Sequence, residues 1–161
     1  MITGCFRQAW LAAHEGRFTI EPLMFHLAGL PSYLVLAELS VKRVLRGELP
    51  TPSYPAALRE HASEVWWGRA DITFGYARSY HAAQGRLTQC VGLVAQAASY
   101  AAHAVLAARG EWITNEKALL TRAGLRCIDE FVAAVDPTPD VLRDMVDLSH
   151  AACLAAFDKA P

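Results

Sequence analysis

The sequence predicts an all-α protein, an up-and-down bundle of about five to seven helices in one domain that spans residues 1–161. Apolar residues recur at spacings of three and four, alanine is abundant, and runs of β-branched residues are short. These three observations together favour helices over strands. Glycine and proline interrupt the pattern between the helical segments, and the chain shows no internal repeat.

The pattern of caps and breaks predicts helices over about residues 4–14, 31–46, 56–84, 87–108, 115–123, 126–135 and 139–158, and a shorter element over 21–28. Three prolines in residues 48–55 predict an extended connection there. A kink is expected near Gly68 or Gly75 in the long segment 56–84. Thr114 is the expected N-cap of the helix that follows it, and Thr138 with Pro139 marks the start of the last helix.

The composition excludes some classes of partner. Hydrophobic residues make up 53% of the chain, charged residues 19%, and the formal net charge is −1. Without a basic field, we expect no nucleic-acid partner. We expect a cytoplasmic protein, because no basic segment followed by an apolar core begins the chain. The apolar excess serves either a large core or a surface for a partner, such as a second copy in a homodimer.

Residues 87–108 carry no charged side chain and are long enough to cross a bilayer. Five polar residues interrupt this segment: Thr88, Gln89, Gln96, Ser99 and His103. We therefore expect a helix buried within the bundle and no membrane partner.

The cysteines and histidines show no pattern of metal ligands. Cys5, Cys90, Cys127 and Cys153 are scattered, and we expect buried, reduced thiols. The six histidines have no spacing that defines zinc, and phosphate-binding glycine loops and serine-nucleophile elbows are lacking from the sequence. We expect no metal and no cofactor held by this chain.

The uncharged helix has a polar stripe at steps of three and four, formed by Gln89, Gly92, Gln96, Ser99 and His103. Two interpretations remain open. The amides and the hydroxyl could pair with neighbouring helices, because buried polar groups need hydrogen-bond partners. Alternatively, Gln96 and His103 line a pocket for a polar ligand.

A second group of candidate binding residues lies just beyond this helix. Trp112, Asn115, Glu116 and Lys117 occur together at a predicted helix start, where unpaired backbone N–H groups favour anions. Glu116 either caps that helix or contacts substrate. Glu38 stands alone in an apolar run and is either solvated or buried and paired.

The last helix carries a different candidate. Arg143 and His150 lie seven residues apart with Asp147 between them, on one helical face. This spacing resembles the loose Arg-to-His motif of HEPN ribonucleases, in which such a pair holds a phosphate and transfers a proton. A homodimeric HEPN-like ribonuclease or toxin is therefore an alternative function, and an ion pair between Arg143 and Asp147 explains the spacing equally well.

Several short motifs resemble one known group of proteins. They are Gly-Leu-Pro-Ser-Tyr at 29–33, Glu-Leu-Ser at 38–40, Gly-Glu-Leu-Pro at 47–50, the Trp66 region, the segment ending at His103 and Glu-Trp-Ile-Thr-Asn-Glu-Lys at 111–117. Over residues 20–125 the chain resembles the helical C-terminal part of actinobacterial nucleotidyltransferase-domain proteins, relatives of kanamycin nucleotidyltransferase.

The resemblance implies a helical domain that covers a catalytic cleft and binds a polar small-molecule acceptor. It places Asn115, Glu116 and Lys117 at the cleft with Trp112 beside them, and makes Glu116 the candidate base. The family's Gly-Ser and Asp-x-Asp motifs, which bind magnesium and the nucleoside triphosphate, do not occur in this chain in a strand setting. Magnesium and nucleotide are thus expected only with a nucleotidyltransferase domain, upstream or in trans. A non-enzymatic interaction module remains a further alternative.

Overall fold

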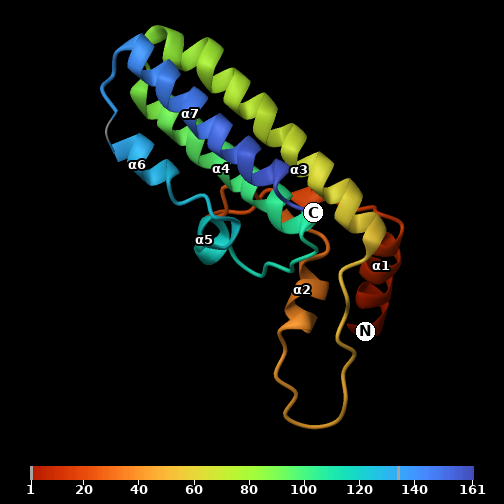
Figure 1. Cartoon of the computed structure of the whole chain (residues 1–161). Helices are drawn as coiled ribbons and strands as arrows, with labels where there is room; N and C mark the ends of the chain where they lie inside the picture. Colours follow the sequence, from red (N-terminus) through yellow and green to blue (C-terminus); the bar gives the residue numbers. More distant parts are fainter. Residues whose placement is uncertain (1, 134) are drawn as a thin grey trace.

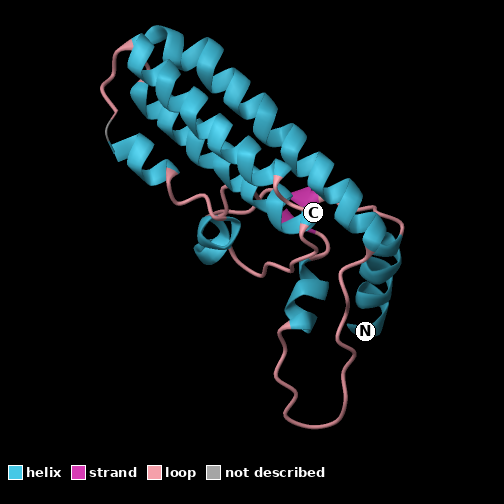
Figure 2. Ribbon diagram, in the orientation of Figure 1, coloured by secondary structure: helices cyan, strands magenta, loops and turns pink. Residues whose placement is uncertain are grey.

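The computed structural model describes residues 2–133 and 135–161 and confirms the predicted all-α helical bundle. Three long helices lie side by side: α3 (Ala56–Tyr76), α4 (Leu87–Ala108) and α7 (Pro139–Asp158) (Figure 1). The shorter helices α1 (Ile2–His14), α2 (Leu34–Ser40), α5 (Leu119–Ala123) and α6 (Ile128–Ala133) surround them. In the described residues the only sheet is the antiparallel pair β1 (Ile20–Glu21) and β2 (Leu30–Pro31), seen in Figure 2.

The uncharged helix α4 is the centre of the bundle, as predicted. It packs against both α3 and α7, and its residues from Ala97 to Ala107, except Tyr100, are buried. By length and composition α4 could cross a membrane, but 67% of its most apolar stretch is buried inside the protein. The many alanines of α4 allow the neighbouring helices to approach closely, so the core forms around α4.

The last helix also begins and ends as predicted. Thr138 is its N-cap residue with Pro139 in the first turn, although the Thr138 side chain makes no capping hydrogen bond. The buried residues of α7 recur at helical spacing on one face: Leu142, Met145, Val146, Ser149 and Cys153. Cys90 and Cys153 are buried as expected, whereas Cys127 is exposed, and the side chain of Cys5 lies outside the described residues.

Other boundaries differ from the sequence prediction. Residues 21–28 form no helix; they begin in β1 and continue as a loop that returns to β2. The helix expected over 31–46 is restricted to α2, and residues 41–55 form an irregular connection that projects beyond the bundle (Figure 1). Asn115, and not Thr114, caps the short 3₁₀ turn Glu116–Ala118, because its Oδ1 accepts the Lys117 N–H at 3.1 Å. The helix expected over 56–84 is α-helical only to Tyr76 and continues as the π-helical turn Ala77–His81 and the 3₁₀ turn Ala82–Gln84.

The corner between α3 and α4 depends on Gly85. Its φ is +66°, and a Cβ at this position would lie 2.9 Å from the carbonyl oxygen of Pro137, just before α7. Gly124, which ends α5, has a similar φ of +78° but no atom within 4 Å of such a Cβ.

We expect Gly85→Ala to lower the free energy of unfolding by about 2–3 kcal/mol, because backbone strain and a steric clash add together. Gly124→Ala is the matched control, with an expected loss of about 1 kcal/mol from the left-handed backbone alone. Urea unfolding followed by circular dichroism measures both variants. Equal losses would show that the contact with the Pro137 segment does not constrain the corner.

Candidate functional site

The loop between β1 and β2 is the most unusual segment of the fold. Its tip is apolar and exposed: the exposed fraction is 77% for Met24 and 95% for Phe25. Phe25 also has a φ of +69°, a left-handed conformation that is unfavourable for a side chain of this size. At the end of the loop, Gly29 has a φ of +80° and passes so close to Glu21 that a Cβ would lie 2.8 Å from the Glu21 carbonyl oxygen. Such a loop needs contacts from elsewhere to hold its conformation.

Glu116 supplies the main contact. Its Oε2 accepts the backbone N–H of Leu27 and its Oε1 accepts the N–H of Ala28, both at 2.8 Å. Hydrogen bonds from N–H groups to a carboxylate are among the stronger ones in proteins. The Asn115 cap sets the start of the 3₁₀ turn that carries Glu116. The carboxylate therefore joins two segments that are far apart in the sequence.

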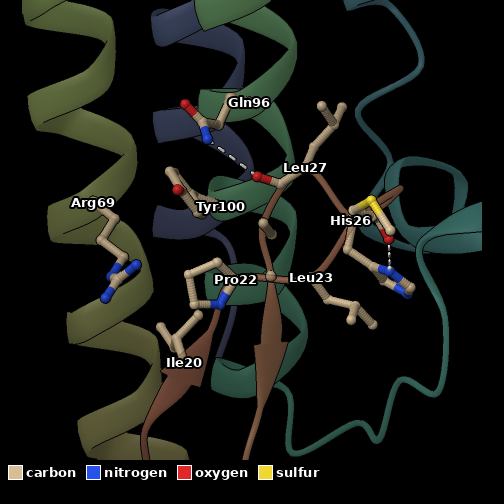
Figure 3. Close-up of a pocket in the computed structure, with 11 residues that line it drawn as sticks. Ile20, Pro22, Leu23, His26, Leu27, Arg69, Gln96 and Tyr100 are labelled. Atoms are coloured by element: carbon tan, nitrogen blue, oxygen red, sulfur yellow. Dashed lines mark hydrogen bonds between the residues drawn. The ribbon is translucent and has the colours of Figure 1, made fainter.

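Gln96 on α4 holds the same loop from the other side. Its Nε2 donates to the carbonyl oxygen of Leu27 at 3.2 Å (Figure 3). Both backbone polar groups of Leu27 are thus bonded to side chains from the helical body. This hydrogen bond accounts for the Gln96 amide in the polar stripe of the uncharged helix.

A pocket of about 430 Å³ lies between this loop and the helices α3 and α4. Arg69 reaches it from α3, and Gln96 and Tyr100 from α4 (Figure 3). The opposite side is mainly apolar and comes from the segment Ile20–Gly29, including Pro22 and Leu23. The pocket thus combines a few polar groups on the helices with an apolar loop, as small-molecule sites do.

Among the described residues, Arg69 is the only Arg, Lys, Asp or Glu that lines this pocket. Its guanidinium carbon lies 5.9 Å from the centre of the Tyr100 ring, within range of a cation–π contact. No carboxylate of the described residues lies within ion-pair distance of Arg69. The exposed guanidinium therefore retains its hydrogen-bond donors for a ligand, and a planar fork of donors suits a carboxylate or a phosphate.

His103 lies deeper, on the same stripe of α4 as Gln96. It is 5% exposed and stacks on Trp66, with ring centres 4.5 Å apart and planes at 15°. Its Nε2 has no hydrogen-bond partner among the described residues. Burial lowers the pKa of His103 to about 4, so the ring is neutral at pH 7.

His103, Asn115 and Glu116 do meet, in a crevice that His26 and Gly29 also line. Its volume of about 10 Å³ has room for about one water molecule. Glu116 and Gln96 hold the loop from its two sides, but the crevice itself does not have the size of a substrate site. The neighbouring Lys117 is exposed and lines neither cavity.

The other predicted binding residues lie elsewhere. Trp112 packs on Tyr54, with ring centres 4.3 Å apart, and its Nε1 donates to the carbonyl oxygen of Pro52 at 3.1 Å. Trp112 thus fixes the extended connection before α3. Glu38 is exposed on α2, which is the solvated alternative for that carboxylate.

Arg143 and His150 are each engaged by a separate carboxylate. Arg143 pairs with Asp140 at 2.8 Å, and Asp147 pairs with Arg78 on the π-helical turn at 2.7 Å. The Nε2 of His150 lies 3.0 Å from Oδ1 of Asp71, without hydrogen-bond alignment.

The His150 ring packs near Trp67 and Phe74 of α3, with ring centres 5.8 and 5.1 Å away. These contacts account for His150 as a residue of the α3–α7 interface. Among the residues that the structure describes, no group of three His, Cys, Asp or Glu side chains could hold a metal ion.

Sequence reasoning missed Arg69, Tyr100 and the loop. One signal was available for Tyr100, since it continues the stripe of Gln96 one turn later. Arg69 looks like any surface arginine in the sequence, because its role depends on α4 and the loop lying beside it.

We expect Glu116→Ala to release the loop between β1 and β2. Amide hydrogen exchange at Leu27 and Ala28 should accelerate by about 10-fold or more, as two charge-assisted hydrogen bonds are lost. Amides in the middle of α4 should keep their rates. The control is Glu111→Ala, which removes a surface carboxylate paired with Arg122. Unchanged exchange at Leu27 and Ala28 in Glu116→Ala would contradict this role.

His103 should make stability depend on pH. Its folded-state pKa of about 4 lies below the ordinary value of 6.5, so the unfolded chain binds the proton first as pH falls. Above about pH 6.5 the ring is neutral in both states and the free energy of unfolding does not depend on it. Between about pH 6.5 and pH 4 the free energy of unfolding falls by about 3 kcal/mol because of this group.

In His103→Gln we expect the loss of stability between pH 7 and pH 4.5 to shrink by about 2 to 3 kcal/mol, measured by urea unfolding. His14→Gln, at an exposed position on α1, is the matched control for the substitution itself. The same slope in both variants would show that His103 does not titrate on unfolding.

Comparison of the chain with known protein families, with curated proteins and with solved structures finds no match in any of the three. The resemblance to nucleotidyltransferase-domain proteins rests on the sequence motifs alone, and the site has to be interpreted from its own geometry.

Proposed function

We propose that this chain is a helical binding domain for a small organic anion, which occupies the pocket between α3, α4 and the β1–β2 loop. The unpaired guanidinium of Arg69 at the pocket carries this proposal. A ligand anion there would gain charge-assisted hydrogen bonds without breaking an existing ion pair. Tyr100 offers a ring face and a hydroxyl beside it, and the apolar loop suits the ligand's hydrocarbon part.

The charge of the pocket also limits which ligand this chain could bind in the role that the nucleotidyltransferase resemblance implies. A lining with one arginine and no carboxylate suits an anion and not Mg²⁺, which prefers carboxylate oxygens. Magnesium and nucleotide would belong to a separate catalytic domain. The polar small-molecule acceptor that this chain binds would then be an anion.

The direct test uses phenyl phosphate and phenylacetate as probes, with phenethylamine as the cationic counterpart. We expect the two anions to shift the amide NMR signals of the loop, Arg69 and Gln96, and phenethylamine to leave them unchanged. Arg69→Gln should weaken anion binding by about 10- to 100-fold, the worth of a hydrogen bond to a charged group.

Arg86→Gln is the control, because Arg86 is exposed and does not line the pocket. It should bind phenyl phosphate as tightly as the unmodified chain in isothermal titration calorimetry. Binding of phenethylamine as tight as that of phenyl phosphate, or equal affinities of Arg69→Gln and the unmodified chain, would refute the proposal.

A further inference from the structure

A second cavity, which we call the apolar groove, opens between α4 and α6. Its volume is about 300 Å³. The residues that define it are Val91, Ala95 and Ala98 of α4, Ile128 and Val132 of α6, and Leu27 of the β1–β2 loop. Helix α6 packs mainly on α7, and the short side chains of α4 leave space between α4 and α6. An apolar cavity of this size is more than a packing defect.

The few polar groups of the groove already have partners. The hydroxyl of Ser99 donates to the carbonyl oxygen of Ala95 at 2.9 Å. Asp129, at the groove, pairs with Arg126 at 2.6 Å. Because these groups keep their partners and the rest of the lining is apolar, a hydrocarbon can occupy the groove without breaking a hydrogen bond.

The groove adjoins the anion pocket at Leu27, which lines both. The N–H and carbonyl groups of Leu27 are bonded to Glu116 and Gln96, so its remaining contribution to either cavity is apolar. On α4, Gln96 of the pocket directly follows Ala95 of the groove in the chain. Gly92, one turn earlier, adds no side chain to this surface, and no other element comes within 4 Å of a Cβ there.

These observations point to one ligand that uses both cavities. We propose that it is an unbranched alkyl carboxylate, with its head group at Arg69 and its tail across Leu27 in the apolar groove. The groove has the volume of about ten water molecules, so the part of the tail beyond Leu27 is limited to roughly eight to ten carbons. This inference rests on the proposed anion-binding function and specifies its ligand class.

The test is a chain-length series of butanoate, hexanoate, octanoate and decanoate in isothermal titration calorimetry. Each added methylene should tighten binding about 4-fold, the usual gain for a buried CH₂, until the groove is filled. Arg69→Gln should weaken every member of the series by a similar factor. Decyltrimethylammonium, with the same tail and the opposite charge, should bind far more weakly than decanoate.

Ala95→Phe fills the groove without touching the pocket. We expect it to weaken decanoate by about 50-fold or more and to leave phenyl phosphate unchanged, since several methylenes lose their contacts. Ala155→Phe, at an exposed position on α7, is the matched control and should bind decanoate normally. Val132→Gln, at a half-buried position on α6, gives a second way to disturb the groove should Ala95→Phe not fold.

The outcomes separate the two proposals. Binding of phenyl phosphate without any gain along the alkanoate series would overturn this inference and leave the anion pocket standing. A chain-length gain that survives in both groove variants would also overturn it, because the tail would then lie elsewhere. Failure of every anion to bind would remove the proposed function itself.

Discussion

The burial of the uncharged helix α4 is the constraint on which the rest of the structure depends. Its alanine-rich surface accepts α3 on one side and α7 on another, and its backbone groups are satisfied within the helix. A buried charge here would cost several kcal/mol. Gln96 and the half-buried Tyr100 lie on α4 at the edge of its contact with α3, and there the β1–β2 loop attaches. The position of the candidate site follows from the way the core is closed.

The parts of the fold that could be predicted are those with local signals. Helix α4 is bounded by charged and glycine residues, and α7 by Thr138 and Pro139 at its start, so both ranges agree with the sequence prediction. Residues 21–28 look helical in isolation, yet the segment gains its hydrogen bonds from Glu116, 89 and 88 residues away from Leu27 and Ala28. A contact at that separation leaves no trace in the local pattern.

The candidate site was predictable in its location more than in its chemistry. Gln96 and Glu116 were both candidate binding residues in the sequence, in two separate groups, and both hold the same loop. What it could not supply was the direction in which Glu116 points, or the presence of Arg69 across the pocket. The first depends on the approach of the β1–β2 loop to Glu116, and the second on the packing of α3 on α4. The type of a charged residue alone does not distinguish a free guanidinium from a paired one.

The contacts of Glu116 also bear on the choice between binding and catalysis. Both of its oxygens are already engaged, since Oε2 accepts the N–H of Leu27 and Oε1 accepts the N–H of Ala28. A general base takes up a proton during each turnover. A general base must therefore touch its substrate, and the crevice beside Glu116 has a volume of only about 10 Å³. A carboxylate whose charge keeps the pocket assembled is better suited to a permanent structural role, and this favours a binding domain over an enzyme that uses Glu116 as its base.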